Sequence, residues 1–575
     1  MYLGIDVGGT HTDAVVVDGG KIRASAKVPT DHDYLLTSIR LALESILADI
    51  NPADVTRLNL STTLSTNAIV EGKIEEVGVF VSAGPGIDPE NMRTGKHFYL
   101  APGSIDHRGI EVEPLDRESI RQAVETCATD GVRVFASVGK FSVRNPAHEN
   151  AMAEAIGNNA DFLTRGHSLS GVLNFPRRVA TSYFNSAVWR IYNDFTWAVE
   201  ETARDFGLSC EINILKADGG TMPLSVSKEL PVESILSGPA ASVMGMIALE
   251  SISSDCVILD IGGTTTDIAI FADGAPIIEK EGMTVGSYPT LVKALKIRSI
   301  GVGGDSALHV RGDEVYVGPD RKGPSMASCD AFGGMSCEIK NGPDGTPAEL
   351  YGRMCAPALT DVLNYLGLSD FGDVHASRSG IERLVAQGER DPEELCSRAA
   401  EFAAEKIRRS VEDLLDEINE KPVYTITELL EGKKVAPRRV YVMGGPAAAM
   451  AGLLRDALGM EVVVPDHFSV ANAIGAALTR TTMEIELFAD TQKRRMIIPA
   501  LGHETEIARN YDLEQAKEDA VRLLKTRMAD LGVSGPEPEI TGEGSFNMVE
   551  GFRTVGRNIR VKCQIRPSAE KLSPK

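Results

Sequence analysis

One stretch decides the fold because it occurs twice, as Leu3-Gly4-Ile5-Asp6-Val7-Gly8-Gly9-Thr10-His11-Thr12-Asp13 and as Leu259-Asp260-Ile261-Gly262-Gly263-Thr264-Thr265-Thr266-Asp267. In both copies an apolar strand leads to an aspartate, and two glycines then allow a tight turn. Hydroxyl residues follow, and a second aspartate precedes another apolar strand. Each copy therefore predicts a β-hairpin with a polar turn.

The two turns suit phosphate groups. Glycine has no Cβ, so backbone N–H groups can approach an anion closely, and threonine hydroxyls add further donors. A carboxylate beside a polyphosphate is repelled unless a divalent cation lies between them, and magnesium prefers oxygen ligands. We therefore expect Mg²⁺ at Asp6 and Asp260. The predicted phosphate-binding residues are Gly8, Gly9, Thr10, Thr12, Gly262, Gly263, Thr264 and Thr265.

One copy alone would fit a plain hairpin equally well, whereas two copies favour a pair of duplicated halves that face each other across a nucleotide cleft. A third segment, Val440-Tyr441-Val442-Met443-Gly444-Gly445-Pro446-Ala447-Ala448, predicts a strand, a glycine turn and a helix. This order of motifs resembles the ATPase superfamily of actin, sugar kinases and heat-shock chaperones. The resemblance implies an α/β fold with duplicated actin-like (ribonuclease H-like) ATPase domains, and it places Gly444 and Gly445 at the adenine or ribose of ATP.

Length and composition limit the classes of protein to which this chain can belong. The 575 residues are too many for one core, and the chain has 43% hydrophobic and 24% charged residues, as expected for globular domains. The net charge of -22 repels nucleic acids and anionic membrane surfaces, so neither partner is expected. The first residues lack a signal peptide, and no apolar run is long enough to span a membrane. The eight cysteines are scattered, which favours a reduced, cytoplasmic protein.

The helix and strand patterns divide the chain into three predicted parts. By the resemblance to the actin-like ATPases, residues 1–180 are expected to form a first actin-like domain and residues 181–490 a second one, with an insertion near 321–358. Residues 491–575 form a separate small α+β module. We expect Trp189 and Trp197, on a long helical segment, to lie in a core or between domains.

Other short segments are candidates for the same cleft. The turn Ser299-Ile300-Gly301-Val302-Gly303-Gly304-Asp305-Ser306 lets its backbone approach a ligand, so Gly303 and Gly304 join the predicted nucleotide site. The segments Asp218-Gly219-Gly220-Thr221 and Leu236-Ser237-Gly238-Pro239-Ala240 are further cleft loops, although the second also fits an ordinary helix start.

Together these motifs resemble the hydantoinase/oxoprolinase family, in particular its ATP-handling A subunit, over roughly residues 1 to 485. The residues that carry the resemblance are the two phosphate loops, the Gly303-Gly304 turn, the Gly444-Gly445 turn, Thr62-Thr63-Leu64-Ser65-Thr66-Asn67-Ala68, Asn145-Pro146-Ala147-His148-Glu149, Leu236-Ser237-Gly238-Pro239-Ala240, Val317-Gly318-Pro319 and Thr360-Asp361.

The resemblance implies an ATP-dependent cyclic amide hydrolase that phosphorylates a carbonyl of a hydantoin, oxoproline or related lactam, usually with a B-type subunit and in an oligomer. Asp6 and Asp260 would act in catalysis with ATP and Mg²⁺. Asp13 and Asp267 would position the metal or the attacking group, or would cap their turns. His148 fits a helix start better than a catalyst.

Two alternatives stay open. A chain with this ATPase core could instead be an ATP-driven activator of a partner enzyme, for example in a corrinoid system. A sugar kinase is less well supported, since no kinase-type base stands out. Cys329, Cys337 and Cys355 fit no standard zinc spacing.

Overall fold

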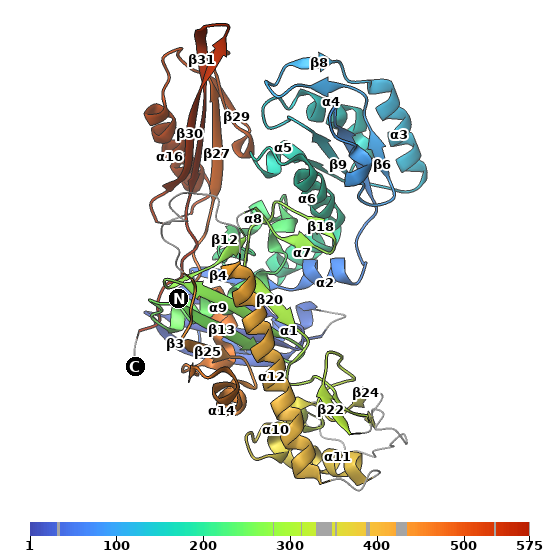
Figure 1. Ribbon diagram of the computed structural model, residues 1–575, viewed down its shortest axis with the longest axis vertical. Helices are drawn as coiled ribbons and strands as arrows, with labels where there is room; N and C mark the ends of the chain where they lie inside the picture. Colours follow the sequence, from blue (N-terminus) through green and yellow to red (C-terminus); the bar gives the residue numbers. More distant parts are fainter. Residues whose placement is uncertain are drawn as a thin grey trace.

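The computed structural model describes residues 1–31, 35–279, 281–311, 313–328, 348–350, 353–386, 391–420, 434–533 and 536–573. Within these ranges the chain is a mixed α/β protein, elongated in Figure 1, with two six-stranded sheets, a four-stranded sheet and a five-stranded sheet as its main layers. None of the described helices is long and apolar enough to cross a membrane. Cys329 and Cys337 lie outside the described residues.

The first six-stranded sheet has the strand order β12-β11-β4-β1-β2-β3. The central strand β1 pairs antiparallel with β2 and parallel with β4, which pairs parallel with β11. Leu3, Ile5 and Val16 are fully buried in its core. The elements are β1 (Tyr2–Val7), β2 (His11–Asp18), β3 (Lys21–Pro29), β4 (Arg57–Thr62), β11 (Glu211–Leu215) and β12 (Thr221–Pro223), with α1 (Leu35–Leu47), α2 (Leu64–Val70), α7 (Trp189–Asp205) and α8 (Leu224–Ser227).

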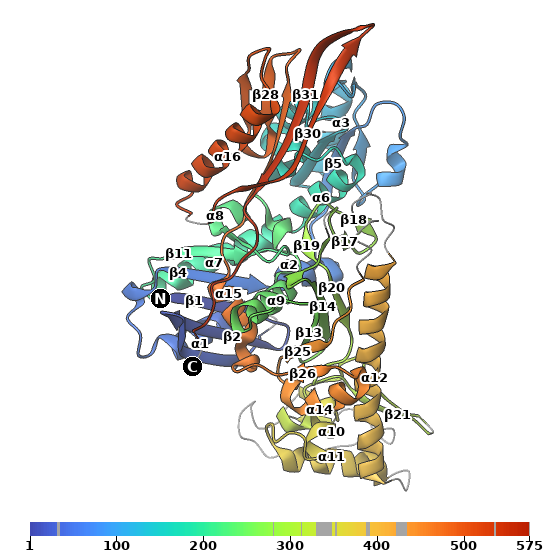
Figure 2. The ribbon, with the colours of Figure 1, turned by 60° about the vertical axis from the view of Figure 1, so that its left-hand side comes forward.

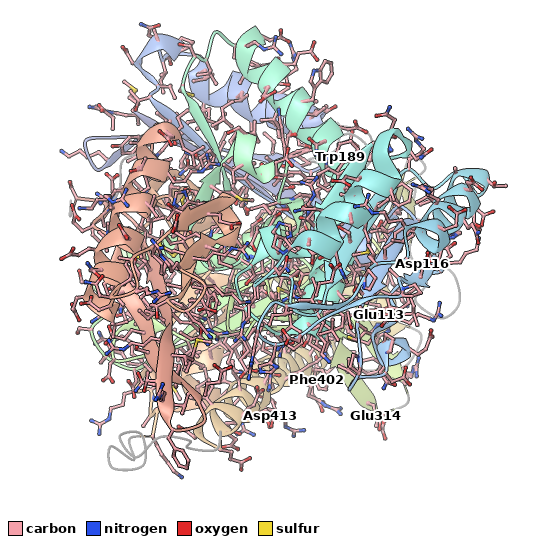
Figure 3. The ribbon with its side chains drawn as sticks, turned by 90° about the horizontal axis from the view of Figure 1, so that it is seen from above. Glu113, Asp116, Trp189, Glu314, Phe402 and Asp413 are labelled. Atoms are coloured by element: carbon pink, nitrogen blue, oxygen red, sulfur yellow. The ribbon has the colours of Figure 1, made fainter. Side chains whose placement is uncertain are left out.

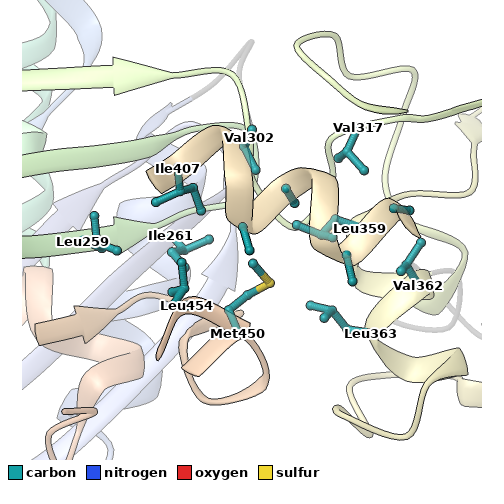
Figure 4. Packing of buried hydrophobic residues seen from close by; sticks show 14 of the residues in the cluster. Leu259, Ile261, Val302, Val317, Leu359, Val362, Leu363, Ile407, Met450 and Leu454 are labelled. Atoms are coloured by element: carbon teal, nitrogen blue, oxygen red, sulfur yellow. The ribbon is translucent and has the colours of Figure 1, made fainter. Parts of the chain in front are cut away.

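The second six-stranded sheet is built around β13, which pairs antiparallel with β14 and parallel with β25. Leu259 and Ile261 alternate toward a large apolar core that also contains Ile407, Met450 and Leu454 (Figure 4). The elements are β13 (Cys256–Ile261), β14 (Thr266–Ala272), β15 (Ala275–Pro276), β20 (Ile297–Ile300), β25 (Arg439–Met443) and β26 (Glu461–Val463), with α10 (Leu359–Tyr365), α11 (Val374–Ala386), α12 (Pro392–Asn419) and α14 (Ala447–Leu458).

Two helices of small residues, α9 (Ser237–Leu249) and α15 (Ala471–Leu478), pack against each other beside the first sheet. Their backbones come very close, because a Cβ on Gly475 would lie 2.0 Å from the Ala241 carbonyl oxygen, and a Cβ on Gly245 would lie 2.1 Å from that of Ala471. Glycine is therefore required at both positions.

A second sheet in the N-terminal region has the order β10-β9-β5-β6, and all of its pairs are parallel. Its elements are β5 (Val77–Ser82), β6 (Phe98–Leu100), β9 (Val134–Gly139) and β10 (Phe162–Arg165), with α3 (Arg117–Thr129), α4 (Ala147–Ile156), α5 (Gly166–Leu169) and α6 (Phe175–Ala187). The loop after β6 holds the short hairpin β7 (Ser104–Ile105) and β8 (Glu111–Glu113).

The two tryptophans of α7 differ in their surroundings. Trp189, labelled in Figure 3, is the first residue of α7 and stacks on Phe162, with ring centroids 4.9 Å apart. Trp197 is 58% exposed, so the expectation that it packs in a core is wrong. It occupies a solvent-facing position of the helix, while Phe195 and Val199 face the core.

The five-stranded C-terminal sheet has the order β29-β28-β27-β31-β30, and α16 packs on it. Its long hairpin projects at the end of the molecule in Figure 2. The elements are β27 (Glu484–Asp490), β28 (Arg495–Ile498), β29 (His503–Glu506), α16 (Leu513–Asp530), β30 (Glu539–Glu550) and β31 (Arg553–Gln564). The sheet thus begins at Glu484, six residues before the limit of 490 expected for the second domain, and both domain boundaries stay predictions.

Short elements fill the remaining connections. The strands are β16 (Ile278–Glu279), β17 (Thr284–Val285), β18 (Tyr288–Pro289), β19 (Ala294–Leu295), β21 (Leu308–Arg311), β22 (Glu314–Val317), β23 (Ala348–Leu350) and β24 (Arg353–Cys355). The 3-10 helix used below is η4 (Pro231–Ser234).

Candidate functional site

The first hairpin places Asp6 directly opposite Asp13, at the ends of β1 and β2 that meet the glycine turn. Ser61, at the end of β4, donates a hydrogen bond to the buried Asp6 carboxylate. Lys27 of β3 donates to both oxygens of Asp13, with an Nζ to Oδ2 distance of 2.7 Å. Asp13 is therefore ion-paired within its own sheet, whereas Asp6 has no cation of the described chain beside it.

The second hairpin repeats this register, with Asp260 of β13 opposite Asp267 of β14. The Ser242 hydroxyl of α9 donates to Asp260 Oδ2 at 2.5 Å, and Ser299 of β20 donates to Asp267. In both turns the first glycine N–H closes the loop, since Gly8 donates to the His11 carbonyl and Gly262 to the Thr265 carbonyl. The predicted hairpins and their aspartates are thus present as expected.

The structure brings the two hairpins together. The Asn472 side chain, on α15, donates through Nδ2 to Asp6 Oδ2 at 3.3 Å and to Asp260 Oδ2 at 3.2 Å. On the turns, a Cβ on Gly263 would lie 2.4 Å from Thr10 Oγ1. Loops that are far apart in the sequence therefore form one polar centre with two carboxylates at its middle.

The predicted glycine turns also lie at this centre. Gly304 donates its N–H to the Gly262 carbonyl at 2.9 Å, so the Gly303-Gly304 turn rests on the second loop. Gly444 has a φ of +92°, and a Cβ there would lie 2.7 Å from Asp260 Oδ1. Gly445 has open space around its Cα, as Gly9 does.

The threonines of the two loops differ in accessibility. Thr10 and Thr264 are partly exposed, and Thr265 is exposed. Thr12 is fully buried, and its hydroxyl lies 3.0 Å from that of Thr30. Its neighbourhood is thus the core of the sheet, and its predicted contact with phosphate stays a prediction like those of the other loop residues.

Burial and neighbouring negative charges raise the pKa values of two aspartates at this centre. Burial raises the pKa of Asp6 to about 7, and the nearby Asp13 and Asp260 carboxylates add to this against the Ser61 and Asn472 hydrogen bonds. Burial, together with Asp260, also raises the pKa of Asp267 to about 7. A divalent cation would offset this repulsion and favour the ionised forms.

These residues fit a magnesium–nucleotide complex better than a metal ion alone. Among the described residues, no group of three or more His, Cys, Asp or Glu could hold a metal by itself. Magnesium keeps several waters and commonly takes one or two protein carboxylates plus substrate phosphates. Two facing carboxylates beside two glycine-threonine turns provide that donor set.

Sequence reasoning missed the residues that orient the carboxylates. Asn472, Ser242 and Ser61 come from a helix or a neighbouring strand, outside both loops. The only signal in the sequence was Asn472 itself, a polar residue inside a run of alanines on a helix otherwise fit for close packing.

Comparison with known proteins decides the family. The family model "Hydantoinase/oxoprolinase" matches residues 178–485, and the model of the N-terminal region of the same family matches residues 2–160. The chain belongs to the hydantoinase/oxoprolinase family. The polar centre described above uses residues from both matched regions.

The relatives include named enzymes of this family. The chain is 27% identical to the caprolactamase subunit alpha of Pseudomonas jessenii over 83% of this chain and 70% of that one. It is 24% identical to 5-oxoprolinase 1 of Arabidopsis thaliana, over 98% of this chain and 49% of that one.

Solved structures show the same overall fold. A nucleotide-free acetone carboxylase gives a TM-score of 0.70 at 16% identity and covers 100% of this chain and 88% of that one. The ATP-dependent caprolactamase from Pseudomonas jessenii gives a TM-score of 0.65 at 19% identity, over 100% and 89%. The family match and the mixed α/β architecture predicted from the motifs are therefore confirmed.

Removing the Asn472 amide is expected to change how the protein responds to magnesium. In Asn472→Ala the two carboxylates lose their shared donor, so the cation-free protein loses about 2 kcal/mol of stability. Added Mg²⁺ then raises the melting temperature more than in wild type. Thermal unfolding in EDTA and in Mg²⁺ measures both effects.

Asn193→Ala is the matched control, because Asn193 also donates twice, but to the neutral carbonyls of Trp189 and Lys228. An equal magnesium response in both variants would contradict the assigned role of Asn472.

Proposed function

We propose that this chain is the ATP-handling subunit of an ATP-dependent cyclic amide hydrolase. It would phosphorylate the carbonyl oxygen of a hydantoin, oxoproline or related lactam and so prepare the ring for opening. The observation that supports this most is the meeting of Asp6 and Asp260 through Asn472 beside two glycine-threonine turns. The ATP-dependent relatives of the family give the reaction class.

The chain's own groups account for the binding steps. Backbone N–H groups and the Thr10 and Thr264 hydroxyls would hold phosphate oxygens, and Asp6 and Asp260 would hold Mg²⁺. Gly444 and Gly445 would lie along the adenosine, and Gly303 and Gly304 would support the second loop. Asp13 and Asp267 would keep the two hairpins in register, with Asp267 also close enough to Asp260 to influence the cation.

Bound magnesium–ATP would supply the phosphoryl group that converts the amide oxygen into a leaving group. An amide carbonyl resists attack by water because its nitrogen donates electrons to it, and phosphorylation of the oxygen removes that resistance. The protein's contribution is to align phosphate and carbonyl and to compensate the charge of the transferring group.

We also propose that the chain works in a complex with a B-type subunit, with the duplicated actin-like halves forming its nucleotide site. The names of two relatives, caprolactamase subunit alpha and acetophenone carboxylase gamma subunit, support a multisubunit enzyme.

The test is magnesium-dependent ATP hydrolysis by the purified chain, alone and with its B-type subunit, in the presence of hydantoins, lactams and 5-oxoproline. Stimulation by at least one ring compound is expected. ATP hydrolysis that responds to no ring compound in the complex would contradict the proposal and would favour an ATP-driven activator of another enzyme. Failure to bind ATP would contradict both.

A further inference from the structure

Five charged side chains gather where β11 ends. Lys216 Nζ lies 2.8 Å from Asp218 Oδ2, and the Gly220 N–H and Thr482 hydroxyl also donate to Asp218. Lys293, just before β19, pairs with Glu484 at the start of β27. Glu233 of η4 is the fifth member, and its charge interacts with those of the other four.

Glu233 differs from its neighbours because its carboxylate accepts no hydrogen bond and forms no ion pair within the described part of the chain. Its backbone carbonyl is used, since it accepts the Ala217 N–H. Burial raises the pKa of Glu233, opposed first by Lys216. Glu233 is only partly exposed, so water reaches its carboxylate from part of its surroundings, and no donor of the described chain is hydrogen-bonded to it.

The cluster lies at the same edge of the first sheet as the candidate nucleotide site. Strands β11, β4 and β1 are parallel neighbours and lie side by side in Figure 2, so their carboxyl ends meet at one edge. Two strand spacings separate β11 from β1, which is about 10 Å. In open α/β sheets this edge is where ligands bind.

A chain of contacts links Glu233 to the first phosphate loop. Ser234, the next residue, shares a hydrogen bond of 2.8 Å with Ser65, at the start of α2. Thr63, just before that helix, donates to the carbonyl of Val7, which precedes Gly8. The loop that carries Glu233 is thus fixed against the turn predicted to hold phosphate.

The backbone around Glu233 is also held in an unusual conformation. Leu236 has a φ of +60°, in the left-handed region that residues other than glycine seldom adopt. Its N–H donates a hydrogen bond to Thr66 Oγ1 at 3.0 Å. Strain of this kind persists only where the surrounding structure imposes it, and it is concentrated at functional sites.

We infer that Glu233 accepts a ring N–H of the amide substrate, and that the cluster selects uncharged cyclic amides over rings that carry a carboxylate. This rests on the proposed function. The cluster holds two cationic and three anionic side chains, and both lysines already face carboxylates. A substrate carboxylate would find no free cation among these five residues and would be repelled by Glu233, whereas a neutral N–H supplies the missing donor.

The test measures ring-stimulated ATP hydrolysis with hydantoin and 2-pyrrolidone as uncharged rings and 5-oxoproline as the anionic ring, using the complex with its B-type subunit. In wild type, kcat/KM for the uncharged rings is expected to exceed that for 5-oxoproline at least tenfold. Glu233→Gln removes the charge at constant size, so this ratio is expected to fall about tenfold, mainly through KM, while ATP affinity is unchanged.

Glu229→Gln is the matched control, because Glu229 is exposed and lies four residues earlier in the chain. A wild-type preference for 5-oxoproline, or an equal ratio in the two variants, would overturn the role of Glu233 and leave the proposed function intact. If no ring stimulates hydrolysis although ATP binds, the proposed function fails, and this inference fails with it. Circular dichroism and ATP affinity separate these outcomes from misfolding of Glu233→Gln.

Discussion

Asp260→Asn and Asp6→Asn are each expected to lower magnesium-dependent ATP hydrolysis at least about a hundredfold. Each carboxylate is buried beside the other and is oriented by a serine hydroxyl and by Asn472. An asparagine keeps the size of the side chain but removes the negative charge that would hold the cation. Both substitutions are therefore expected to weaken cation binding. The steady-state rate over a range of Mg²⁺ concentrations measures this effect.

The control for these variants is Asp18→Asn. Asp18 lies at the exposed end of β2 and pairs with Arg23 at 2.9 Å, an interaction that contributes little at a surface. Hydrolysis at the wild-type rate in either Asp6→Asn or Asp260→Asn, with normal magnesium dependence, would contradict the placement of the cation between them.

The sequence allowed the two hairpins to be predicted because each is a local pattern. Strand, aspartate, paired glycines and threonines are adjacent in the chain, and their register follows from the turn. The pairing of Asp6 with Asp13 and of Asp260 with Asp267 is therefore present as the pattern implied.

What the sequence did not reveal depends on contacts between distant segments. Asn472 reaches both aspartates only because α15 packs beside β1, and a run of alanines carries no information about its partners. The Lys27 pair with Asp13 likewise needs the register of β3 against β2. Trp197 was misplaced because large apolar residues are often, but not always, buried, and helical spacing alone did not separate its face from that of Phe195.

Gly475→Ala is expected to destabilise the protein by about 3 kcal/mol and to weaken magnesium–ATP binding. The added methyl would lie 2.0 Å from the Ala241 carbonyl oxygen and 2.5 Å from the Gly245 nitrogen, both backbone atoms that cannot rotate away. Helices α9 and α15 must then move apart. Because α9 carries Ser242 and α15 carries Asn472, this movement also disturbs both donors to Asp260. Urea unfolding and nucleotide titration measure the two effects.

The control is Gly452→Ala, at a glycine of α14 where the nearest atom to the added methyl would be 3.8 Å away. Alanine is expected to stabilise this helix by up to about 1 kcal/mol. Equal stability of the two variants would show that the close approach of α9 and α15 does not control the site.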